Sequence, residues 1–146
     1  MEKDPAAATE GVIEMAAEQA TPGMHLLLDF WGCRNMQDID GIEIALRRAA
    51  EACRATVISV QLHSFGAAAG VTGVAILAES HISIHTWPET GYVALDIFVC
   101  GNCDAARGAD VLADYFQPQR QETTACRRGK TPAALPAQPR NLANNP

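Results

Sequence analysis

The chain has 146 residues and a formal net charge of -6, which suits one domain that buries roughly two-thirds of its unfolded surface. The basic residues cluster only at Arg127, Arg128 and Lys130, so the basic footprint of a nucleic-acid-binding protein is missing. No apolar run reaches the ~18 residues of a membrane span, and the acidic N-terminus is unlike a signal peptide. We therefore expect a cytoplasmic protein with neither nucleic-acid nor membrane partners.

The first half of the chain predicts a strand, a helix and a second strand. The mostly apolar run 24–31 is expected to form a central strand. Apolar residues that recur every three or four positions between 42 and 53 predict a helix, which either Asp38 or Asp40 can cap. The alternating, β-branched run 56–65 predicts the second strand.

The second half of the chain predicts three strands in succession, then a helix and an edge strand. The three strands are the runs 71–78, the following stretch through Trp87, and 92–100. Asp104 can cap a helix that runs to Phe116, Pro118 ends it, and residues 121–126 are the candidate edge strand. Successive strands favour antiparallel pairing. The order predicts an α+β fold, a two-layer sandwich with a mainly antiparallel sheet and helices on one face.

Composition divides the chain into three parts. We expect a flexible N-terminal segment over residues 1–22, in which Val12 to Ala20 has the pattern of a short helix. The ordered domain is expected over residues 23–128, and the tail 129–146, rich in proline and asparagine, is expected to be disordered.

An unusual polar cluster lies in the stretch from Ala78 to Glu89, AESHISIHTWPE, which otherwise has the pattern of a buried strand. Polar side chains in such a strand cost free energy unless they find partners. One hypothesis is hydrogen bonding alone. The other is chemical, and patterning alone does not establish its route, which the resemblance described next implies: the Ser80 hydroxyl attacks the Glu79 carbonyl to form a backbone ester, and elimination cleaves the chain. The dehydroalanine left at the new N-terminus then hydrolyses to a pyruvoyl group with release of ammonia.

The same stretch, followed by GYVALDIFVCG, resembles the short prokaryotic S-adenosylmethionine decarboxylase proenzymes. The likeness runs from about Gly23 to Gly129 and includes HLLLDFWGC, ATVISVQLHSF and GVTGVAILAESHISIHTWPE. It implies a self-processing, pyruvoyl-dependent lyase that forms a Schiff base with S-adenosylmethionine, releases CO2 and supplies the aminopropyl donor for spermidine biosynthesis. Decarboxylation of L-arginine or L-ornithine by the same chemistry is the alternative.

The resemblance also assigns catalytic roles. It implies cleavage between Glu79 and Ser80, with Ser80 the precursor of the pyruvoyl cofactor and no metal. His85 matches the processing histidine, and Cys100 matches the cysteine that donates a proton to the decarboxylated carbon.

Substrate-binding roles follow from the same likeness. Glu89 matches the residue that binds the ribose, Phe65 the aromatic that stacks on adenine, and Thr72 stands where the family commonly has serine. The linker GAAAG lacks the usual proline, and Cys103 is atypical. The first two departures concern substrate recognition and leave the cleavage residues unchanged.

The resemblance implies specific partners as well. The β chain, residues 1–79, and the α chain, residues 80–146, are expected to stay in one fold after cleavage. We expect a homodimer of processed protomers whose active site the two protomers could share.

Several other readings stay open from the residues alone. His81-x3-His85 with Cys100-x2-Cys103 supplies four ligands for a zinc site, and the same two cysteines allow a redox domain. A relative that has lost catalysis is a third possibility. We interpret His81 and Ser83 as structural. The cysteines are expected to be free thiols, with Cys33 and Cys53 in packing positions and Cys126 on an edge strand.

Overall fold

The computed structural model describes residues 23–130. The short helix expected at Val12 to Ala20 and most of the expected tail lie outside the described residues. The elements are β1 (Gly23–Trp31), α2 (Ile39–Ala52), β2 (Val57–Ser64), β3 (Val71–Leu77), β4 (Ser80–Trp87), β5 (Tyr92–Cys100), α3 (Ala105–Phe116) and β6 (Arg120–Arg128). Each expected element of the ordered domain is present.

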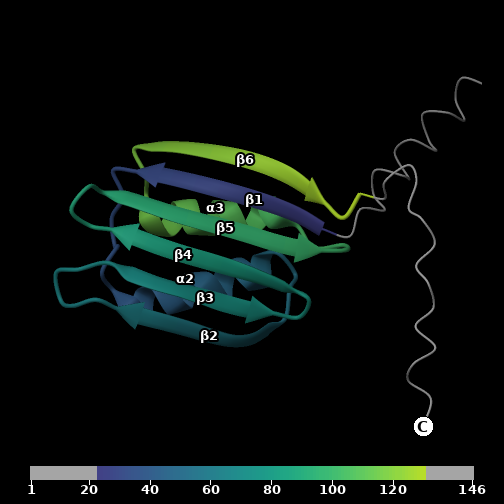
Figure 1. Cartoon of the computed structure of the whole chain (residues 1–146), viewed down its shortest axis with the longest axis horizontal. Helices are drawn as coiled ribbons and strands as arrows, with labels where there is room; N and C mark the ends of the chain where they lie inside the picture. Colours follow the sequence, from purple (N-terminus) through teal and green to yellow (C-terminus); the bar gives the residue numbers. More distant parts are fainter. Residues whose placement is uncertain (1–22, 131–146) are drawn as a thin grey trace, which may run out of the picture.

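The six strands form one sheet in the order β2-β3-β4-β5-β1-β6, and every neighbouring pair is antiparallel. β3, β4 and β5 follow one another as hairpins, while β1 lies between β5 and the edge strand β6. Figure 1 shows α2 and α3 side by side on the same face of this sheet. The fold is the predicted two-layer α+β sandwich, and β1 is central as expected.

The helix α2 begins where the sequence indicates. Asp38 is its N-cap, and the Asp38 carboxylate accepts a hydrogen bond from the Gly41 backbone N–H at 3.1 Å. Its apolar positions recur on one side and are buried: Ile42, Ala45, Leu46, Ala49 and Ala50. That face packs on β2 and β3 and against α3.

The helix α3 has a matching start and a sharp end. Asp104 caps it by accepting from the Ala106 N–H at 3.1 Å. Gln117 ends it in a left-handed conformation with φ 46°, and Pro118 follows. Leu112 and Phe116 are buried, whereas Val111 and Tyr115 are only half-buried. The chain then turns back to form β6 beside β1.

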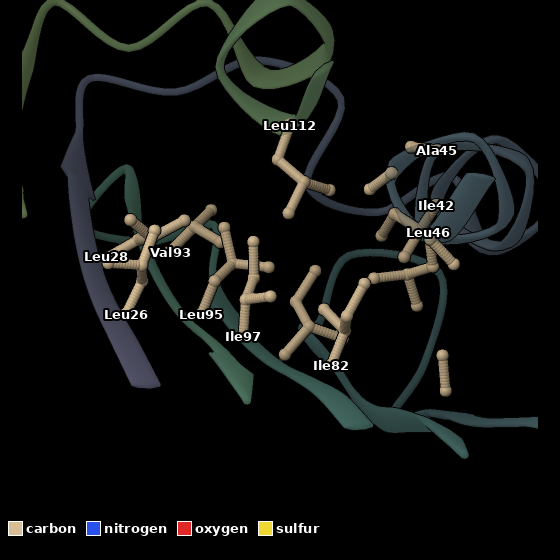
Figure 2. Close-up of a cluster of buried hydrophobic side chains, with 14 of the residues drawn as sticks. Leu26, Leu28, Ile42, Ala45, Leu46, Ile82, Val93, Leu95, Ile97 and Leu112 are labelled. Carbon is tan, nitrogen blue, oxygen red and sulfur yellow. The ribbon is translucent and has the colours of Figure 1, made fainter. Parts of the chain in front are cut away.

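The hydrophobic core fills the space between the sheet and the two helices. Figure 2 shows strand residues such as Leu28, Ile82 and Ile97 pointing toward Leu46 of α2 and Leu112 of α3. These side chains are at most 1% exposed. Because strand side chains alternate between faces, burial of every second residue leaves the intervening residues on the opposite face.

The face of the sheet opposite the helices, called here the open face, carries an unusual set of side chains. Within residues 23–130 no element covers it. It carries His25, Leu27, Asp29 and Trp31 of β1, His81, Ser83, His85 and Trp87 of β4, and Tyr92, Asp96 and Phe98 of β5. The polar stretch singled out in the sequence thus contributes its alternate residues to this face.

The described part of the chain contains no helix that is long and apolar enough to span a membrane. The longer of the two helices, α2, has 14 residues.

Candidate active site

The Glu79–Ser80 bond lies at the tip of the hairpin between β3 and β4. Leu77 pairs with Ser80, so Ala78 and Glu79 form a two-residue turn. Glu79 has φ 58°, in the left-handed region that costs an L-residue roughly 1–2 kcal/mol. A turn with one left-handed residue in its second position usually carries glycine there. The backbone strain therefore falls on the residue whose carbonyl Ser80 would attack.

A thiol lies directly beside this bond. Cys100 ends β5, and the pairing of His81 with Phe98 brings it to the same end of the sheet as the hairpin tip. The Ser80 hydroxyl donates to Cys100 Sγ at 3.7 Å, and the Cys100 thiol donates to Glu79 Oε2 at 3.6 Å. Ser80 and Cys100 are half-buried and Glu79 is exposed. These three residues are called the serine half-site below.

The other predicted residues gather at the opposite end of the same strands. His85 pairs with Thr72 across β4 and β3, and His85 Nδ1 shares a hydrogen bond with the Thr72 hydroxyl at 3.1 Å. Phe65 directly follows β2, whose last residue pairs with Val71, and its side chain is 64% exposed. Glu89 lies in the turn between β4 and β5 and is exposed. His85, Thr72, Phe65 and Glu89 are called the histidine half-site below.

The two half-sites do not meet within one chain. Ser80 and His85 are five residues apart on one straight strand, which separates them by about 16 Å at the usual rise per residue. Cys100, which contacts Ser80, has the strand parity of Asp96 and Phe98, so the serine half-site adjoins the open face that also carries His85. The structure brings Ser80 together with Glu79 and Cys100, but not with His85.

The zinc hypothesis is wrong in its geometry. His81 and His85 share the open face but are four residues apart on a strand, about 13 Å, whereas zinc ligands surround one ion at 2.0–2.3 Å. Cys103 lies in the loop before α3, where its thiol donates to the Arg54 carbonyl at 3.6 Å. Cys100 contacts Ser80 and Glu79 instead, so the four proposed ligands do not gather.

A polar network on the open face holds the remaining members of the stretch. His25 Nε2 lies 2.6 Å and His81 Nε2 3.4 Å from Asp96 Oδ2, while the Ser83 hydroxyl donates to Asp96 Oδ1. Arg128 adds a contact to His25 Nδ1 at 3.3 Å. These contacts agree with the structural reading of His81 and Ser83.

The network sets the charge state of Asp96. Burial by itself would raise the pKa of this carboxyl, but hydrogen bonds from Ser83, His25 and His81 outweigh it and hold the pKa below its usual range. Sequence reasoning did not single out His25 or Asp96. The available signal was that Asp96 is the one charged residue in the otherwise apolar run of β5.

A row of aromatic rings crosses the open face next to the histidine half-site. Trp31 stacks on Tyr92 and Tyr92 on Trp87, with ring centroids 5.8 and 5.2 Å apart, and Trp87 lies 6.1 Å from the His85 ring. Tyr92 donates to Asp29, and this hydrogen bond, with a smaller contribution from burial, raises the pKa of Tyr92 to about 12. The stacked rings hold Trp87 beside the His85 ring.

The remaining cysteines behave as the sequence predicts. Cys33 and Cys53 are buried, and burial raises the pKa of each thiol to about 11. Cys126 is exposed on the edge strand β6, and all five cysteines are free. The two buried thiols therefore stay protonated and serve in packing.

A family model and two relatives all point to the same family of decarboxylases. A family model described as S-adenosylmethionine decarboxylase matches residues 24–129. A relative from Methanococcus maripaludis strain C5, named S-adenosylmethionine decarboxylase proenzyme, is 56% identical over 112 residues, covering 73% of this chain and 89% of the relative. A relative of the same name from Thermomicrobium roseum is 44% identical over 108 residues, covering 73% and 93%.

A solved structure agrees. The crystal structure of the adenosylmethionine decarboxylase from Aquifex aeolicus superimposes with a TM-score of 0.70 at 33% identity, covering 80% of this chain and 98% of that chain. A sandwich that presents a strained Glu-Ser turn beside a thiol thus falls in the class of decarboxylase proenzymes. Within that class, the chain belongs to the S-adenosylmethionine decarboxylase family.

Proposed function

We propose that this chain is a proenzyme that cleaves itself between Glu79 and Ser80 and then decarboxylates S-adenosylmethionine. The observation that carries the proposal is the hairpin tip, where a left-handed Glu79 precedes a serine whose hydroxyl contacts a thiol. Family membership supplies the substrate. L-Arginine and L-ornithine are not favoured, because the matched relatives are named for S-adenosylmethionine.

The residues present fit a pyruvoyl group formed from Ser80. Ser80 is the first residue of β4, so after cleavage the new end remains anchored by the pairing of β4 with β3 and β5. The turn that precedes it is exposed, so its two new ends can separate without opening the core. When formed, a pyruvoyl carbonyl supplies the electron sink for loss of a carboxylate.

The chain's own side chains would handle protons and orient the substrate. Cys100 Sγ, which lies 3.7 Å from the Ser80 hydroxyl, holds the proton that replaces the departed carboxylate on the substrate α-carbon. Phe65, with most of its ring exposed, offers a stacking surface for adenine, and Glu89 an acceptor for ribose hydroxyls. His85, held by Thr72, removes the Ser80 α-proton during cleavage.

This assignment of His85 requires a second copy of the chain. Within one protomer His85 lies about 16 Å along the strand from Ser80, too far for proton transfer. A two-fold axis that brings two open faces together with their strands reversed would place the His85 end of each over the Ser80 end of the other. Leu27, Ile76 and Trp87 leave apolar surface exposed on that face, at 39, 42 and 40%. The proposed enzyme is therefore a homodimer with two shared sites.

The substrate is tested directly by counting CO2. Purified protein would be given S-adenosylmethionine, arginine or ornithine, each labelled at the carboxyl carbon. We expect label to be released from S-adenosylmethionine alone, and none from a Ser80→Ala variant. Release from arginine with none from S-adenosylmethionine would contradict the substrate, and full release by Ser80→Ala would contradict the mechanism.

A further inference from the structure

A continuous hydrogen-bond chain connects the attacking serine to a carboxylate. It runs from the Ser80 hydroxyl to Cys100 Sγ at 3.7 Å, and from the Cys100 thiol to Glu79 Oε2 at 3.6 Å. We propose that the Glu79 carboxylate is the base that activates Ser80, through Cys100, in the first step of self-cleavage. The inference rests on the proposed function and adds to it a role for the Glu79 side chain, in addition to its carbonyl.

The direction of the two hydrogen bonds favours proton movement from Ser80 toward Glu79. A serine hydroxyl is a weak nucleophile unless a base removes its proton as it attacks. Both hydrogen bonds donate in the direction from Ser80 to Glu79. A proton that leaves the Ser80 hydroxyl is therefore accepted by the Cys100 sulfur while the thiol proton passes to the Glu79 carboxylate. The Glu79 side chain is the last acceptor of this hydrogen-bond series, and it faces solvent.

Within residues 23–130, no other base is linked to the Ser80 hydroxyl by hydrogen bonds. Among the residues that the structure describes, the hydrogen-bond partner of the Ser80 hydroxyl is Cys100. His81 is adjacent in sequence, but its Nε2 is directed to Asp96 on the open face. His85 is about 16 Å along the strand. Glu79 is thus the base that hydrogen bonds connect to Ser80, and the contact that joins it to Cys100 spans 21 positions of the sequence.

The step balances without a co-reactant. A bond forms between Ser80 Oγ and the Glu79 carbonyl carbon as the Ser80 proton moves to Cys100 Sγ and the thiol proton moves to Glu79 Oε2. When the bond from that carbonyl carbon to the Ser80 nitrogen breaks, the protons return along the same relay and the nitrogen takes one. The product is an ester with a free Ser80 amine. Carboxylate and thiol end as they began.

The relay separates two steps of cleavage. Glu79 and Cys100 act on the hydroxyl proton before the ester exists, whereas His85 acts on the Ser80 α-proton after it forms. A chain that lacks the Glu79 carboxylate should stop as an amide, and one that lacks His85 should stop as an ester. Hydroxylamine cleaves esters and leaves ordinary amides intact, so it distinguishes the two.

The test uses the full chain made by cell-free translation, with cleavage followed on gels over time. Glu79→Gln should slow cleavage by about 10²- to 10⁴-fold, the usual contribution of a positioned base. Glu79→Ala should be as slow, and added formate should restore much of its rate because the turn is exposed. Hydroxylamine should cut the uncleaved His85→Ala chain at residue 79 and leave the Glu79→Gln chain intact. Glu122→Gln, an exposed carboxylate on β6, is the matched control and should cleave at the wild-type rate.

Backbone effects are separated by one more variant. Asn tolerates the left-handed conformation well, so Glu79→Asn keeps the turn and removes the carboxylate. It should be as slow as Glu79→Gln. A wild-type rate in Glu79→Gln, or a slow Glu79→Ala chain that formate does not speed, would overturn the relay. If the wild-type chain itself never cleaves, the proposed function fails instead.

Discussion

Glu79 joins strain and chemistry in one residue. Its left-handed φ of 58° occupies a turn position in which glycine is usual, and its carbonyl carbon is the proposed point of attack. Strained backbone persists where the surrounding structure over-determines it, and here two paired strands hold the turn. This conformational cost of roughly 1–2 kcal/mol raises the free energy of the uncleaved chain and so reduces the barrier to acyl transfer.

Thr72 is predicted to matter through its hydroxyl and not through its size. Thr72→Val keeps the shape but removes the hydrogen bond to His85 Nδ1, which should slow self-cleavage by about 2- to 12-fold, the equivalent of about 0.5–1.5 kcal/mol. Thr72→Ser keeps the hydroxyl and should cleave at close to the wild-type rate. Rates can be read from gels of freshly translated chains. Equal rates for the Val and Ser variants would contradict this role.

We predict that Asp96 makes the free energy of unfolding depend on pH in the acid range. Because its folded-state pKa is depressed, its stabilisation is complete above the unfolded value near 3.8 and is lost as the pH falls through the folded value. Asp96→Asn should therefore lower the free energy of unfolding by about 1–3 kcal/mol at neutral pH. The gap to the wild type should narrow as the pH falls below 3.8.

Urea unfolding of both proteins across this pH range measures the gap. Asp114→Asn, an exposed carboxyl on α3, is the control and should follow the wild type at every pH. If the difference in free energy of unfolding between the two proteins is the same at every pH, the charge of Asp96 does not contribute to stability.

At the scale of elements, α2 and α3 depend on one close approach. A Cβ added to Gly108 would collide with Cys53 Sγ and would lie 3.1 Å from the Ala49 carbonyl oxygen. In an ordinary helix, Gly→Ala stabilises by roughly 0.5–1 kcal/mol. Here Gly108→Ala should instead destabilise by about 1–3 kcal/mol, because it overpacks the contact between the helices.

A double-mutant cycle isolates this contact. Cys53→Ala removes the sulfur, so Gly108→Ala should cost less in that background than in the wild type. Urea unfolding of the four proteins gives the coupling free energy. Strict additivity would mean that Gly108 and Cys53 do not limit the helix approach.

The secondary structure could be predicted because each element has a local signal. Asp38 and Asp104 stand before apolar residues with helical spacing, and both are N-caps. The hairpins follow from short turns between β-branched runs. What the sequence could not provide was the partner of each polar strand residue: Asp96 lies 71 residues from His25, and only the pairing of β1 with β5 brings them together.

The candidate site was predictable as a set of residues but not as an arrangement. The family resemblance named Ser80, His85 and Cys100 together. The strand geometry then divides them, because five residues of extended chain separate the histidine from the serine. Cys100 reaches Ser80 only because β5 returns beside β4. Sequence likeness identified the chemistry, and the sheet shows that Ser80 and His85 lie apart within one protomer.

At the scale of the whole molecule, shared sites predict complementation between two inactive variants. Ser80→Ala and His85→Ala chains should each remain uncut alone. In a mixed dimer, the His85→Ala chain keeps its own Ser80 and receives His85 from its partner, so it should be cleaved. Co-expression with distinct tags followed by gel analysis measures this. If the His85→Ala chain stays uncut in mixed dimers, His85 does not act across the dimer.

The central claim is that the chain converts its own backbone into a cofactor, and an intact mass spectrum of the denatured, purified protein tests it most directly. The account predicts two fragments, residues 1–79 and 80–146, the second lighter by one ammonia than a fragment that begins with serine. A single uncut chain of 15.6 kDa after prolonged incubation would contradict it.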